Sequence, residues 1–189
     1  MRWKLVSLAL LLAPGCGYNE VIDRDEDVKA AWAEVENQYT RRAELVPNLV
    51  KVVKGAADFE KETLKEVVEA RSKVSQLKID SGILDDPARL QAFEAAQGQL
   101  SGALSKLMVV VEKYPNLKAT DAFRDLQAQL EGTENRIAVA RKRFIEEVAA
   151  YNKVVLRFPT NIGSALRGKD ERETFKAAAG AEKPPEVDL

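Results

Sequence analysis

The stretch that decides the fold is residues 121–158, DAFRDLQAQLEGTENRIAVARKRFIEEVAAYNKVVLRF. Its apolar residues recur at intervals of three and four, so Phe123, Ile137 and Phe158 fall on one seam of a helix. Pro159 ends this pattern because its ring clashes with the preceding helical turn. A helix of this extent would be about 57 Å long at 1.5 Å per residue, which predicts a rod rather than a globule.

The same periodicity predicts three helices upstream, over residues 25–46, 47–77 and 86–114. Asp86 and Pro87 suit the N-cap and the first position of the third of these helices. Pro47 disfavours helical geometry at the residue before it, so we expect a break or kink near residues 44–47.

These elements predict an all-α protein, an elongated antiparallel four-helix bundle with kinked first helices and short C-terminal helical turns near residues 161–166 and 170–179. We assign residues 1–15 to a signal peptide and residues 16–24 to a lipidated tether. Residues 25–168 are assigned to the helical bundle, and residues 169–189 to a short helix with a flexible tail. In the alternative arrangement the long fourth helix pairs between two chains as a coiled coil, although polar residues on the seams disfavour a regular zipper.

The amino terminus has the organisation of a secretory signal, with a basic head, the apolar run LVSLALLLA at residues 5–13 and small residues before Cys16. The run is shorter than the roughly 20 apolar residues that span a bilayer. The sequence Ala13-Pro14-Gly15-Cys16 resembles a bacterial lipobox, with Ala13 in the place of the usual leucine. Cys16 is therefore the predicted lipid attachment, and an ordinary cleaved signal or an uncleaved signal anchor are the alternatives.

The composition excludes several kinds of chemistry. The chain has no histidine and one cysteine, so catalytic Ser-His-Asp or Cys-His arrangements, His/Cys zinc sites and an internal disulfide are excluded. It has no Gly-rich phosphate loop and no EF-hand pattern. The formal net charge of −1 argues against a nucleic-acid partner. We therefore expect no enzyme, and accordingly no catalytic residues, no cofactor and no metal site.

Arg42 is the most informative polar residue because it falls on the apolar stripe of the first helix. A buried arginine needs charged or hydrogen-bonding partners. Glu112 follows an apolar stretch of the third helix, while Glu134 and Arg141 lie near the seam of the fourth. These four residues form a candidate polar network, which either sets helix register as a structural ion pair or binds a ligand in a groove. The structural interpretation is favoured, since such networks usually specify packing.

Seven motifs follow one another along the chain: CGYN (16–19), RRAELVPNLV (41–50), EKETL (60–64), LSGAL (100–104), EKYPNLK (112–118), EGTENRI (131–137) and FPTN (158–161). Together they resemble the LemA family of bacterial membrane-associated proteins. The resemblance implies a helical bundle held at a membrane, with its domain outside the cytoplasm. It brings no catalytic residues, because the molecular activity of the family is undefined. Ala56 and Phe59 stand where many relatives carry Tyr and His. Any role of that histidine as a base or metal ligand therefore does not apply to this chain.

The sequence thus predicts a non-enzymatic lipoprotein, anchored in a membrane and facing the periplasm or the cell exterior, that acts as a helical scaffold or interaction protein of the bacterial envelope. Its expected partners are the membrane, through the lipid anchor, and other envelope proteins, while oligomerisation stays open. The alternative is a binding module that holds a lipid or other hydrophobic ligand between its helices. Such a module needs an internal apolar cavity of some hundreds of Å³, whereas a scaffold should be solid inside.

Overall fold

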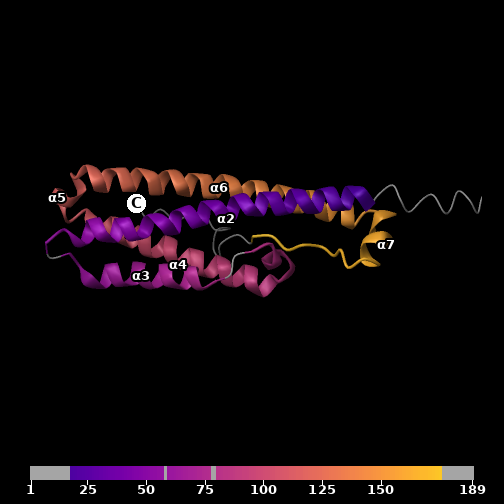
Figure 1. Ribbon diagram of the computed structural model, residues 1–189, viewed down its shortest axis with the longest axis horizontal. Helices are drawn as coiled ribbons and strands as arrows, with labels where there is room; N and C mark the ends of the chain where they lie inside the picture. The colour runs from indigo at the N-terminus through magenta and orange to yellow at the C-terminus, as the bar shows by residue number, and fades with distance from the viewer. Residues whose placement is uncertain (1–17, 58, 78–79, 176–189) are drawn as a thin grey trace, which may run out of the picture.

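The computed structural model describes residues 18–57, 59–77 and 80–175, and every regular element in these ranges is a helix. Four long helices lie side by side and give the molecule an elongated shape (Figure 1). They are α2 (Tyr18–Lys54), α3 (Lys61–Gln76), α4 (Pro87–Val111) and α6 (Asp121–Val155). The short elements are the 3-10 helix η2 (Ser81–Asp85), α5 (Pro115–Lys118) and α7 (Thr160–Ala165). The prediction of an all-α fold is confirmed.

The two longest helices, α2 and α6, pack along one another, and α3 packs along α4 and touches α2. One end of the rod, called here the α7 end, holds the start of α2, the end of α6, and α7 (Figure 1). The opposite end, the α5 end, holds the end of α2, α5 and the start of α6. The chain therefore enters the rod at the α7 end.

The core consists of two apolar clusters along the rod. The cluster nearer the α5 end contains fully buried residues such as Leu49 and Leu107. The cluster nearer the α7 end is aromatic: the Trp32 ring meets the edges of Phe93 and Phe144, each at a centroid distance of 5.4 Å. Such edge-on contacts contribute about 1 kcal/mol each beyond the burial of their area.

Of the break or kink predicted near Pro47, the break is wrong and the kink stays a prediction, because α2 continues through this residue to Lys54 and the helix is first interrupted at residues 55–57. Proline has no N–H, so the carbonyl of Ala43 loses its helical hydrogen bond. The Nε of Arg71 on α3 donates to that carbonyl at 3.0 Å instead. Val46 is completely buried, so tertiary packing also favours the continuous helix.

The helical turn predicted from residue 170 does not form in the described part of that range. Residues 169–175 instead form an extended segment, called the strap. Asn152 on α6 exchanges two hydrogen bonds of 2.9 Å with the backbone N–H and carbonyl of Arg172. These backbone groups are thus satisfied without a helix, and Phe175 enters the aromatic cluster. The predicted tail beyond residue 175 lies outside the described residues.

The start of the third predicted helix agrees with the structure. The side chain of Asp86 accepts hydrogen bonds from the backbone N–H groups of Ala88 and Arg89, at 3.0 and 3.2 Å, and Pro87 opens α4. In the described ranges, no helix combines the length and apolar character needed to cross a bilayer. The predicted signal segment and Cys16 lie outside these ranges.

Candidate functional site

Arg42 projects from the middle of α2 and is 1 % exposed. Its Nη1 donates to Ser101 Oγ at 2.6 Å and to Glu134 Oε1 at 2.5 Å, and its Nη2 donates to the carbonyl and side-chain oxygens of Gln97. A guanidinium removed from water is costly unless such partners compensate it. Glu134 on α6 supplies the opposite charge, while Gln97 and Ser101 on α4 supply neutral acceptors. These four residues, called the polar layer, join three helices.

The polar layer lies between the two apolar clusters. On α2, Arg42 separates Tyr39 of the aromatic cluster from Val46 of the other cluster. On α4, Gln97 lies between Phe93 and Leu100, which belong to different clusters. A shift of α2 by one helical turn would move the guanidinium into apolar surroundings. The geometry therefore supports a role of the polar layer in fixing helix register.

An open groove runs between α4 and α6 over the polar layer, with a volume of about 1120 Å³. Arg141 on α6 lies in this groove, where its Nη1 donates to the Tyr39 hydroxyl at 3.1 Å and its Nη2 pairs with Glu94 Oε1 at 3.3 Å. Glu134 also faces the groove, and its side chain is 46 % exposed. The charged residues that line the groove are thus three cations and three carboxylates that already pair with one another, Arg42 with Glu134, Arg141 with Glu94 and Lys142 with Glu146.

Of the four residues predicted as a network, the structure brings Arg42 and Glu134 into contact and places Arg141 in the same groove. Glu112 lies elsewhere, at the C-cap of α4 near the α5 end, where Oε2 pairs with Lys118 Nζ at 2.6 Å. Two partners were missing from the predicted network. The sequence could have indicated Gln97, because it is a polar residue on the apolar stripe of α4. Nothing in the sequence pattern indicated Ser101.

The profile of the LemA family matches residues 31–189. The chain belongs to the LemA family. Among its relatives, the magnetosome protein MamQ of Magnetospirillum gryphiswaldense is 30 % identical over 183 residues, which cover 88 % of this chain and 67 % of the relative. The magnetosome protein MamQ 2 of Paramagnetospirillum magneticum is 27 % identical with the same coverage. Protein LemA of Metamycoplasma hominis is 22 % identical over 143 residues, covering 76 % of this chain and 61 % of the relative.

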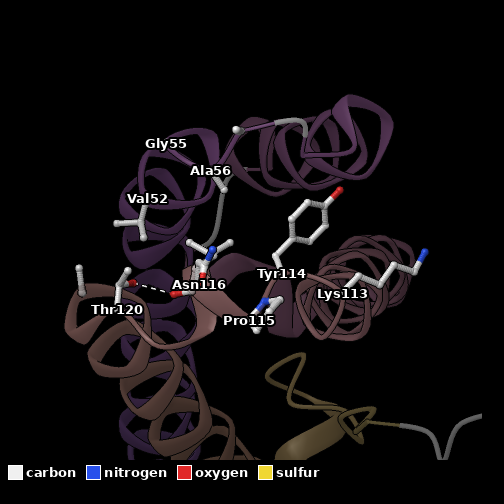
Figure 2. Close-up of a pocket in the computed structure, with 11 residues that line it drawn as sticks. Val52, Gly55, Ala56, Lys113, Tyr114, Pro115, Asn116 and Thr120 are labelled. Carbon is white, nitrogen blue, oxygen red and sulfur yellow. Dashed lines mark hydrogen bonds between the residues drawn. The ribbon is translucent and has the colours of Figure 1, made fainter.

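The EKYPNLK motif, one of those by which the sequence resembled LemA proteins, builds a second hollow at the α5 end (Figure 2). This hollow has a volume of about 610 Å³ and is lined by the end of α2 and by α5 with its flanking residues. The Tyr114 ring packs on Phe59 at a centroid distance of 4.8 Å, and the Thr120 hydroxyl donates to the Leu117 carbonyl at 2.8 Å. Among the described residues, no carboxylate lines the hollow, so it suits an apolar side chain better than a cation.

A second buried charge in this LemA protein fastens the strap to α2. Asp25 is 2 % exposed and pairs with Lys169 and Arg172 of the strap at 2.9 and 2.8 Å, and with Lys29 at 3.1 Å. Burial alone would raise the pKa of the Asp25 carboxyl, but the hydrogen bonds from Lys169 and Lys29 and the positive charges of Arg172 and Lys169 together hold its pKa below the ordinary value. The sequence pattern did not indicate this site because its partners lie far apart along the chain.

Neither arrangement of charges presents the geometry of a catalytic centre. The described part of the chain contains no group of three or more His, Cys, Asp or Glu residues placed to hold a metal ion. Arg42 is directed at structural partners on two helices, and Asp25 is enclosed by three cations. The contacts described for these residues hold the helices and the strap in position, and the prediction that this LemA protein is not an enzyme stays a prediction.

Proposed function

We propose that this LemA protein is a lipoprotein, attached to a membrane through Cys16, that projects a non-enzymatic helical scaffold into the periplasm or the cell exterior. The scaffold presents an interaction surface to other envelope proteins. The observation that carries this proposal is the position at which the chain enters the rod. Tyr18, the first residue of α2, lies two positions after Cys16, so the α5 end is the part farthest from the anchor (Figure 1).

The dimensions of the rod support this arrangement. The 37 residues of α2 extend about 55 Å at 1.5 Å per residue. An anchor at Cys16 therefore allows the hollow at the α5 end to reach partners well away from the lipid surface. Because Lys113 and Asn116 line that hollow and are exposed, its rim is accessible to another protein.

The character of the interior favours a scaffold over a carrier of hydrophobic ligands. The two apolar clusters and the polar layer fill the space between the helices, and the groove over the polar layer and the hollow at the α5 end both open to solvent. A hydrophobic ligand held between the helices would need an enclosed apolar cavity. The carrier is thus the weaker alternative.

Anchoring is tested by substituting Cys16→Ser in the full chain and following an alkyne-labelled fatty acid in cells. The wild-type protein should take up the label and sediment with membranes. The Cys16→Ser protein should lose both properties, because no other cysteine exists. A variant that stays in the membrane fraction with its leader uncleaved would contradict lipidation and support the signal anchor.

The scaffold role is tested with a photo-crosslinking amino acid at Asn116, on the rim of the hollow, and at Ala128, an exposed residue of α6 away from it. A discrete envelope protein should be captured from position 116 and not from position 128. Capture of lipid alone, from either position, would contradict the scaffold and support the carrier.

A further inference from the structure

Apolar side chains are concentrated on the surface of the α7 end. Of the eight large apolar residues exposed in the described ranges, four fall within residues 156–166. They are Leu156, Phe158, Ile162 and Leu166, with exposed fractions of 60, 75, 56 and 83 %. We call these four residues the apolar patch. The other four exposed apolar residues, Val68, Val109, Val139 and Ile145, lie on separate stretches of the chain along the sides of the rod.

The orientation of α7 is the reverse of that expected for a surface helix in water. Ser164 faces the protein, since it is 2 % exposed and its hydroxyl donates to the Thr160 carbonyl at 3.0 Å. Ile162 and Leu166, one turn apart, lie on the opposite side of the helix and face solvent. A helix that buries its serine and exposes its isoleucine and its C-cap leucine is placed for an apolar environment outside the protein.

The charged residues of the chain segment that carries the apolar patch are all basic. Residues 148–169 contain Lys153, Arg157, Arg167 and Lys169 and no acidic residue. The acidic residues of the strap follow only from Asp170, where the chain turns back along the rod (Figure 1). The start of α2 contributes exposed carboxylates, of which Glu20 is the first, to the same end. Cations beside exposed apolar side chains are typical of segments that bind a bilayer with anionic head groups.

The position of the patch also identifies the surface that it meets. α7 packs against both α2 and α6, so it is fixed at the end of the rod where α2 begins. Only Gly17 separates Tyr18 from Cys16, and two residues extend at most about 7 Å. A lipid on Cys16 would therefore bring the bilayer directly to the α7 end.

We infer that the apolar patch of residues 156–166 inserts into the head-group region of the bilayer that carries the anchor, and that this second contact holds the rod upright. The inference rests on the proposed anchoring for the identity of the bilayer, and on the exposed side chains for the contact itself. The lipid on Cys16 attaches the chain to the bilayer at one point only, so a second apolar and cationic contact would restrain the tilt of the rod. A rod held at one point could swing freely, whereas a rod held at two points projects the α5 end outward.

The experiment uses the full chain, processed in cells and reconstituted into vesicles that contain phosphatidylglycerol. Because Cys16 is the only cysteine and is consumed by lipidation, Leu166→Cys introduces one thiol for an environment-sensitive fluorophore. Asn116→Cys, an exposed position at the α5 end, is the matched control. The label at position 166 should show a blue-shifted emission that spin-labelled lipids quench, and the label at position 116 should show neither. Adding Phe158→Ser and Ile162→Ser to the Leu166→Cys protein should remove the blue shift with no change in melting temperature, since both side chains are exposed.

The mass of the mature chain and the fluorescence of the label separate the two proposals. A lipidated, vesicle-bound protein whose label at position 166 remains in water would overturn the insertion of the patch and leave anchoring intact. If the mass shows no lipid, lipidation is overturned and the thiol of Cys16 is free, so the label is placed in the Cys16→Ser background, where a blue shift on vesicles would still support the patch. An unlipidated protein whose label also remains in water would overturn both.

Discussion

Arg71 on α3 donates a hydrogen bond of 3.0 Å to the backbone carbonyl of Ala43 on α2, the carbonyl that Pro47 leaves without its helical partner. This contact lets a proline stand inside a continuous helix, and it joins two helices at the same time. The RRAELVPNLV motif thus depends on a side chain outside it.

Replacing Arg71 by Met should lower the free energy of unfolding by about 0.5–1.5 kcal/mol, the net contribution of a hydrogen bond to this part-buried carbonyl. The same substitution in a Pro47→Ala background should cost markedly less, because an alanine at position 47 supplies the missing N–H. Urea unfolding of the four proteins in this cycle measures the coupling. The exposed Arg41→Met is the control and should cost the same in both backgrounds. Equal costs of Arg71→Met in the two backgrounds would contradict the explanation.

Glu134→Ala should destabilise the fold by about 1.5–3 kcal/mol, because it removes the charged acceptor of the buried Arg42 guanidinium. The exposed Glu131→Ala on the same helix is the matched control and should change stability by less than about 0.5 kcal/mol. Denaturant unfolding with full-length protein provides the measurement. If the two variants are equally stable, the polar layer does not fix helix register, and a ligand-binding role for the groove becomes the better explanation of Arg42.

The strap should loosen in acid. Since the pKa of Asp25 is lowered in the folded protein, its contribution to stability is present above the ordinary value of 3.8 and is lost as the pH falls through the lower folded value. The protection of the Arg172 amide, whose N–H is bonded to Asn152, relative to its intrinsic exchange rate should therefore fall below about pH 4. Asp25→Asn should show fast exchange already at neutral pH, and the exposed Asp27→Asn should behave as wild type. Unchanged exchange in Asp25→Asn would show that the strap does not depend on this carboxylate.

Phe175→Ala should detach the strap from the aromatic cluster and cost about 3 kcal/mol, as for a buried Phe reduced to Ala. The Phe175 ring lies 5.2 Å from Phe144 and 6.0 Å from Trp32, so the fluorescence of Trp32 reports the change. Glu171→Ala, an exposed position in the same strap, should leave both stability and emission unchanged. A fully stable Phe175→Ala protein would contradict the packing described for the strap.

Local patterns were enough to predict α6 and α4 with its start, because apolar periodicity and the Asp86–Pro87 pair act within a few residues. Two errors share a non-local cause. The helix through Pro47 depends on Arg71, 28 residues from Ala43 in the sequence, and the extended strap depends on Asn152, 20 residues before Arg172. The same distinction applies to the candidate site. The sequence pattern places Arg42 on an apolar stripe, whereas only the folded structure shows that Ser101 accepts a hydrogen bond from it.

The proposed lipid on Cys16 is what holds the scaffold to its membrane, and the intact mass of the mature protein purified from membranes tests this attachment most directly. We predict a chain that begins at Cys16, with residues 1–15 removed and the mass of attached acyl chains added. A chain that retains residues 1–15, or one that begins elsewhere without added lipid, would contradict the proposal.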